Sequence, residues 1–134
     1  YGGGVLAPNG DIHFIPRSAT VGQKIISGTN TTSTYALTYT IANAYGGGVL
    51  APNGDIHFIP RSVTVGQKII SGTNTTSTYA LTYSAVSAYQ GGILAPNGDI
   101  HFIPQNATVG QRIITSSSKP FPNNIVLSGY LNKL

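Results

Sequence analysis

Apolar and polar positions alternate in short runs along this chain, and residues that favour turns separate the runs. The first four runs lie near residues 3–7, 11–16, 23–27 and 33–40. The fourth is dense in β-branched and aromatic residues, which favour strands. No window shows a sustained helical period. The pattern therefore predicts an almost entirely β chain that opens with four short strands.

Two local signals mark the ends of these strands. Asn9-Gly10 stands between the first two apolar runs. Asn-Gly is a strong hairpin signal, because a two-residue type I′ turn needs positive φ at both central residues. Pro16 closes the second run, since proline cannot donate to a strand ladder. We expect a two-residue type I′ hairpin followed by a strand that stops at the proline.

The whole pattern repeats with a period of 44 residues. Residues 1–44 and 45–88 differ at only five positions, and the third copy, 89–134, drifts after Ile114. Repeats of this size indicate an architecture of stacked or radially arranged units. We expect one domain of three units, with the last outer strand formed by "NIVLSGYL".

Three all-β folds fit a unit of four strands. Four-stranded units of about 40–50 residues are typical of β-propeller blades. A β-trefoil or a β-prism also uses three repeats of this size, and either would be complete as a monomer. Short strands and a tight first turn favour the propeller meander, because a trefoil needs longer strands and longer, irregular connections.

A family resemblance points the same way. "GGVLAPNGDIHFIP", "TVGQKIISGTN" and "TSTYALTYT" resemble a family of highly repetitive β-propeller repeats of microbial, protozoan and viral proteins, related in pattern to NHL and kelch blades. The resemblance covers nearly the whole chain. It implies a propeller of four-stranded blades, three per chain, and it carries no settled activity.

Three blades cannot close a ring alone, since propellers have about four to eight. We therefore expect either a homodimer that closes six blades or further blades in a longer chain. The expected core is apolar and recurs 44 residues later. Its members in the first copy are Val5, Leu6, Ile12, Phe14, Ile15, Ile25, Ile26 and Leu37.

Composition narrows the functional classes. Only 7% of the 134 residues are charged and the net charge is +4, without a basic cluster, so nucleic-acid binding is not favoured. The chain has no Cys, which excludes disulfides and thiol nucleophiles. It has no Met and no apolar run long enough to span a membrane. Low charge favours an extracellular or virion-associated location.

Histidine and aspartate recur once in each copy. His13, His57 and His101 lie on the second strand; in a ring they cannot converge on a metal, so we expect packed histidines bonded to a neighbouring backbone group or hydroxyl. The aspartate after each Asn-Gly is expected to accept backbone N–H groups at its turn. No metal site, cofactor or catalytic set is predicted.

The polar loop after each strand-ending proline is the candidate ligand site, because loops on rigid scaffolds carry function. Its residues are Arg17, Ser18, Arg61, Ser62, Gln105 and Asn106.

The function predicted from these features is a non-enzymatic binding or display module. A rigid ring would offer repeated weak sites for glycans or another surface, in the manner of a lectin, and would gain avidity from their number. The alternative is a structural virion component such as a decoration or fibre-tip domain. RNA binding is less favoured.

Overall fold

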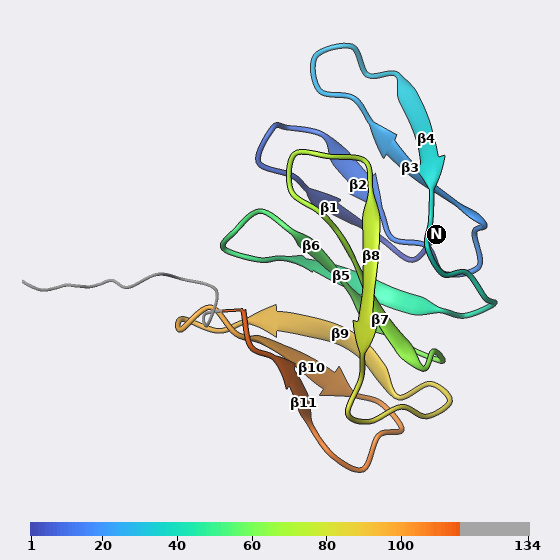
Figure 1. Ribbon diagram of the computed structural model, residues 1–134, viewed down its shortest axis with the longest axis vertical. Coiled ribbons are helices and arrows are strands. Elements are labelled where there is room, and N and C mark those ends of the chain that lie inside the picture. Colours follow the sequence, from blue (N-terminus) through green and yellow to red (C-terminus); the bar gives the residue numbers. More distant parts are fainter. Residues whose placement is uncertain (116–134) are drawn as a thin grey trace, which may run out of the picture.

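The computed structural model describes residues 1–115, which form three antiparallel sheets (Figure 1). The first sheet, in spatial order, contains β1 (Gly4–Leu6), β2 (Ile12–Phe14), β3 (Val21–Ile25) and β4 (Thr32–Ala36). The second contains β5 (Tyr45–Leu50), β6 (Ile56–Pro60), β7 (Val65–Ile69) and β8 (Thr76–Ala80). The third contains β9 (Tyr89–Leu94), β10 (Ile100–Pro104) and β11 (Gln111–Ile113). The described part holds no helix that is long and apolar enough to cross a membrane.

The predicted meander is confirmed, with shifts at two strands. The third strand begins at Val21 rather than 23, because Val21 pairs with Ala36 across the ladder. The fourth ends at Ala36 rather than 40, because the next residues leave the sheet: the amide of Thr38 bonds to Gln67 of the second sheet. The predicted strand "NIVLSGYL" lies outside the described residues.

The first hairpin forms, but the predicted type I′ turn is wrong. The amide of Gly10 donates to Ala7 O at 3.0 Å and that of Ala7 to Asp11 O at 2.8 Å, so the loop has three residues. Of the three loop residues, only Gly10 has a positive φ, at 93°. Pro8 occupies the first loop position and holds φ negative there, which selects a turn followed by one left-handed glycine.

The second sheet buries apolar side chains on both of its faces, because a sheet packs on each side of it. We call the face toward the next sheet in the chain the forward face, and the opposite one the rear face. Strand alternation and register place His13, Lys24 and Tyr35 on the forward face of the first sheet. Phe14 and Gln23 lie on its rear face. Two apolar clusters result, one at each junction between sheets.

Glycine permits the close approach of neighbouring sheets at both junctions. A Cβ added at Gly48 would lie 2.5 Å from Ile15 Cδ1, and one at Gly92 would lie 2.5 Å from Ile59 Cδ1. Contacts this short do not occur between real atoms, so an isoleucine of one sheet seats directly on the glycine backbone of the next. The repeated glycines are therefore sockets for a repeated isoleucine.

A glutamine ties the sheets together beside these sockets. Gln67 is fully buried; its Oε1 accepts from the amides of Thr38 and Tyr39 at 2.9 and 3.1 Å, and its Nε2 donates to Tyr39 O at 3.0 Å. Gln111 makes the corresponding bonds at the next junction. Each glutamine satisfies backbone groups of the segment that leaves the preceding sheet.

The predicted core is confirmed best in the second sheet, although Ile70 of that copy is 38% exposed, and it is confirmed only in part elsewhere. Ile56, Phe58, Ile59 and Ile69 are all buried. Leu6 of the first sheet, by contrast, is 61% exposed. The prediction was wrong for such positions because they face no further sheet within residues 1–115.

A second group of core residues was not predicted. Tyr45 and Tyr89 are fully buried, each packed against a phenylalanine of its own sheet at ring-centroid distances of 5.3 Å. Each of their hydroxyls has a hydrogen-bond partner: that of Tyr45 donates to Val65 O and that of Tyr89 to Val109 O.

Candidate functional site

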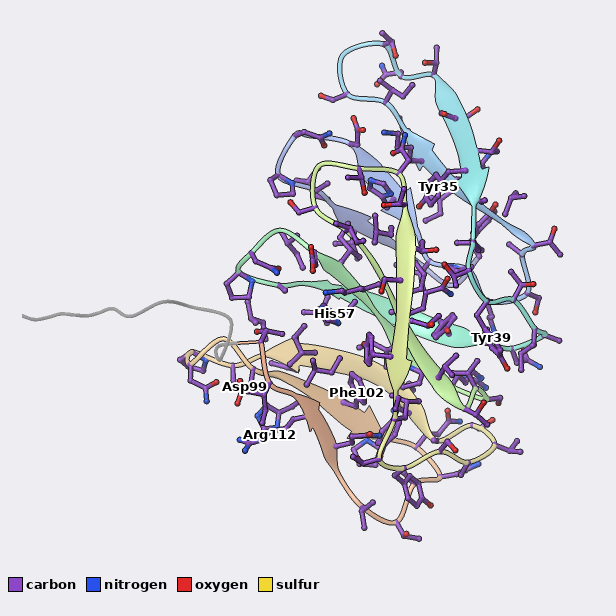
Figure 2. The ribbon with its side chains drawn as sticks, viewed as in Figure 1. Tyr35, Tyr39, His57, Asp99, Phe102 and Arg112 are labelled. Atoms are coloured by element: carbon purple, nitrogen blue, oxygen red, sulfur yellow. The ribbon has the colours of Figure 1, made fainter. Side chains whose placement is uncertain are left out.

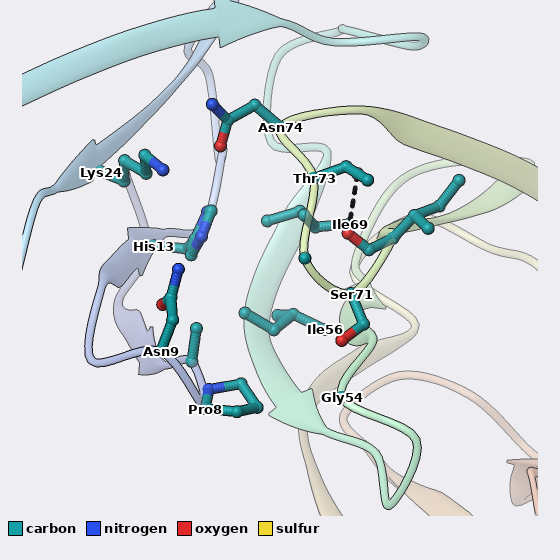
Figure 3. Close-up of a pocket in the computed structure, with 13 residues that line it drawn as sticks. Pro8, Asn9, His13, Lys24, Gly54, Ile56, Ile69, Ser71, Thr73 and Asn74 are labelled. Carbon is teal, nitrogen blue, oxygen red and sulfur yellow. Dashed lines mark hydrogen bonds between the residues drawn. The ribbon is translucent and has the colours of Figure 1, made fainter.

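A cleft opens between the first and second sheets at the hairpin ends of their strands (Figure 3). Its volume is about 210 Å³. One wall carries Asn9, His13 and Lys24, and the facing wall carries Ile56 and Ile69 with the turn that follows β7. The cleft therefore combines a polar wall from one sheet with a largely apolar wall from the next.

The same cleft recurs between the second and third sheets. Its polar wall is Asn53, His57 and Lys68, its facing wall includes Ile113 and Ile114, and its volume is about 430 Å³. Each of the five residues stands 44 positions after a residue of the first cleft or its adjoining turn. The repeat thus produces a repeated site, at the opposite ends of the strands from the loops that the sequence favoured.

The aspartate of each copy lies at the cleft end of its sheet and binds groups of the neighbouring strand and turn. Asp11 accepts from the Ser27 amide at 2.9 Å and from Lys24 Nζ at 2.7 Å, so it joins the β1–β2 turn to the β3–β4 turn. Asp55 does the same with Ser71 and Lys68. In the third sheet Asp99 pairs with Arg112 at 3.3 Å (Figure 2). The prediction that this aspartate accepts backbone N–H groups is confirmed for the first two copies.

A histidine–tyrosine pair forms part of the polar wall. Nδ1 of His13 lies 2.9 Å from the Tyr35 hydroxyl, and Nδ1 of His57 lies 3.0 Å from that of Tyr79. Tyrosine reaches across β3 because the residue beneath its ring is a glycine: a Cβ at Gly22 would come 2.2 Å from the Tyr35 ring. The predicted packed and bonded histidine is therefore confirmed for the first two copies.

The third histidine is different. His101 is exposed, because no further sheet covers its face within residues 1–115. In the same part of the chain, no group of three or more His, Cys, Asp or Glu side chains could hold a metal ion.

Electrostatics keep the cleft histidines neutral. Burial, together with the smaller effect of the nearby positive charge of Lys68, lowers the pKa of His57 from 6.5 to about 4. The pKa of His13 is lowered for the same two reasons. Burial also raises the pKa of the Tyr79 hydroxyl above its ordinary 10.0. At neutral pH the site therefore holds a neutral imidazole beside a protonated phenol.

Asp11 and Asp55 remain ionised. The hydrogen bond from Lys24, together with that from the Ser27 amide, lowers the pKa of Asp11 to about 2. Burial alone would raise the pKa of Asp55, but the bonds from Lys68 and the Ser71 amide outweigh it and hold the pKa below 3.8. Each lysine charge is thus compensated within its own sheet.

This arrangement can exchange a proton with a bound molecule. With Nδ1 engaged by tyrosine, Nε2 of His57 is left for a second partner, and no hydrogen bond to it is formed within residues 1–115. A neutral imidazole accepts a proton, and the apolar wall opposite would hold a nonpolar part of a ligand. Sequence reasoning could have found this polar wall, because the histidine, lysine and tyrosine recur with the period and lie on one face of the sheet.

The loops predicted to bind ligand serve in the scaffold. Ser18 Oγ accepts from the Asn43 amide at 3.1 Å and Ser62 Oγ from the Ser87 amide at 3.0 Å. Arg17 O accepts from the Ala44 amide at 2.7 Å. Arg17, Gln105 and Asn106 are exposed, and Arg61 is half-buried. Ligand binding by these residues stays a prediction.

Comparison with known proteins identifies the fold. No family model matches the chain, and no curated protein matches it. The solved structures that resemble it include the following three. Two are virginiamycin B lyase from Staphylococcus aureus, one of them a catalytically inactive histidine-to-alanine variant with quinupristin; they have TM-scores of 0.67 and 0.68 and 20% identity over 84% of this chain and 37% of theirs. The third is a streptogramin B lyase, with a TM-score of 0.66 and 21% identity over 90% of this chain and 40% of its own.

The likeness supports a β-propeller-like repeat fold, and the chain spans well under half the length of these structures. It also corrects the predicted function. A non-enzymatic binding or display module is contradicted, because the structures that share this arrangement of sheets are named as enzymes. Composition misled the prediction, since a low surface charge does not report on the chemistry of a cleft between sheets.

Proposed function

We propose that this chain supplies three blades of a β-propeller enzyme of the lyase type, and that substrate binds in the clefts between blades. The observation that carries the proposal is the neutral imidazole of His57, paired with Tyr79 and facing an apolar wall. The fold shared with virginiamycin B lyase and streptogramin B lyase supports the reaction class.

The cleft suits a lyase reaction for a chemical reason. A lyase breaks a bond without adding water, so a base must take a proton from the substrate and an acid must give one to the leaving group. A neutral His57 with its proton on Nδ1 serves as the base through Nε2, and the imidazolium that forms then gives the proton taken up at Nε2 to the leaving group. In that tautomer Nδ1–H donates to the oxygen of the Tyr79 hydroxyl, which burial keeps protonated, and this bond holds the imidazole in position. In the virginiamycin B lyase that this fold resembles, a variant with one histidine replaced by alanine is catalytically inactive.

Quinupristin is the first substrate to test, with products followed by mass spectrometry. Lyase cleavage conserves the total mass of the substrate, whereas hydrolysis adds one water. Turnover with conserved mass is the expected result. If the folded chain leaves quinupristin unchanged, or adds water to it, the lyase assignment is contradicted.

The site is tested by substitution. The double variant His13→Gln/His57→Gln should lower kcat/KM by about 100-fold, the usual contribution of a general base. Arg17→Gln, at the opposite ends of the strands, is the matched control and should leave kcat/KM unchanged. A large loss in the control alone would place the site on the loop predicted from sequence.

A further inference from the structure

The two ends of the described stack are open and apolar. On the forward face of the third sheet, Ile93 is 60% and Ile103 39% exposed. On the rear face of the first sheet, Leu6 is 61% and Ile12 38% exposed. Monomeric proteins rarely leave such patches uncovered.

The internal junctions show what fits these faces. Ile15 seats on Gly48 and Ile59 on Gly92, with nearly the same geometry each time. The next isoleucine in this series is Ile103, which seats on nothing within residues 1–115, and the glycine that begins the series is Gly4. A Cβ at Gly4 would meet only atoms of its own sheet, none nearer than 3.4 Å. One end of the chain therefore carries a knob and the other an empty socket of matching shape.

At the open rear face of the first sheet, only one partner of the polar junction contact is present. Gln67 and Gln111 each bind backbone groups of the preceding sheet. Gln23, at the same place in the first sheet, is half-buried and has no such partner within residues 1–115. The side-chain amide of Gln23 thus offers a donor and an acceptor beside Gly4. A preceding sheet of the same kind would supply their partners.

We propose that a second copy of this chain occupies both open faces, head to tail, so that Ile103 of each copy seats on Gly4 of the other and the two chains close one ring. The partner is a second copy because its end has the shape and hydrogen-bonding groups that the internal junctions already use. Charge does not oppose the contact, since Arg112 on the joining face is paired with Asp99. Each new junction would also cover His101, as the internal junctions cover His13 and His57.

Light scattering during size-exclusion chromatography tests the proposal. The wild-type chain should have twice the 13.9 kDa mass of one copy at concentrations down to about 1 µM. Gly4→Ala should have the mass of one copy, because the added methyl group fills the socket, while circular dichroism stays that of the folded chain. Gly47→Ala is the matched control: its Cβ would meet nothing within 4 Å, so this variant should remain a dimer.

A second variant changes the opposite end of the stack, the forward face of the third sheet. Ile103→Asp puts a charge on the knob and should also have the mass of one copy, with unchanged circular dichroism. A wild-type chain with the mass of one copy or of more than two would overturn the proposal. So would a Gly4→Ala variant that remains dimeric. The readout is mass alone, so its failure is separate from failure of the lyase assignment.

Discussion

Strands β6 and β10 have the same sequence, Ile-His-Phe-Ile-Pro, and different surroundings. In β6 all five residues are buried, whereas in β10 only the first and third are. Phe58 and Phe102 are both covered, because the rear face of each strand meets a preceding sheet. Ile59 is 0% exposed and Ile103 39%, because only β6 has a described sheet in front of it. Burial in this protein is therefore a property of the junction and not of the residue.

The largest expected effect compares Phe58 with Phe14, its counterpart on the open rear face. Phe58→Ala should lower the free energy of unfolding by about 3–5 kcal/mol, as for a large buried side chain. Phe14→Ala should cost about 1–2 kcal/mol, because Phe14 is only half-buried and packs edge-on against Tyr1. Urea denaturation of both in the Gly4→Ala background, where no second copy should cover Phe14, measures the difference. Equal losses of unfolding free energy in the two variants would show that packing at the first junction stabilises the chain no more than packing on the open face.

The glutamine clamp gives the next largest difference. Gln67→Leu should lower the free energy of unfolding by about 3 kcal/mol, since it leaves the amide and the carbonyl of the half-buried Tyr39 without their partner. Gln23→Leu in the Gly4→Ala background should change it by less than about 0.5 kcal/mol. Thermal unfolding at a fixed pH measures both. A loss at Gln23 as large as that at Gln67 would mean that the rear face is already covered.

The smallest expected effect concerns pH. The pKa of His57 is about 4 in the fold against 6.5 when unfolded. Between these values the unfolded chain binds a proton that the folded chain does not, so stability falls as pH falls from about 6.5 to 4. The loss between pH 7 and 4.5 is on the order of 2 kcal/mol.

Two variants isolate this contribution. His57→Gln removes the titrating group, and urea midpoints of this variant should depend less on pH over that range than those of the wild type. His101→Gln, at the exposed counterpart, should keep the wild-type dependence in the Gly4→Ala background. The aspartates add their own acid destabilisation, because the pKa of Asp11 is also depressed, and both variants retain it. An unchanged pH profile in His57→Gln would contradict a buried, neutral histidine.

Several elements could be predicted from the residues because their causes are local. Strands and hairpins followed from alternation and turn residues, and the aspartate that binds a turn amide followed from its place after Asn-Gly. The turn type did not follow, because Pro8 restricts φ next to a dipeptide that would otherwise favour type I′. Tyr45 was missed as a core residue because its burial depends on the neighbouring sheet, and the cleft was missed because its two walls come from different repeats.

The amino-acid sequence by itself determined the period of 44 residues, the β content and the repeated chemistry of histidine, lysine, tyrosine and aspartate. These follow from local backbone preferences and from residues that recur at the same place in each repeat. Only the tertiary structure decided which copies of that chemistry are enclosed. His13 and His57 are buried because another sheet packs over them, and His101 remains open because none does within residues 1–115. The physical reason is that removing a side chain from water requires a second surface, and identical repeats differ only in whether they have one.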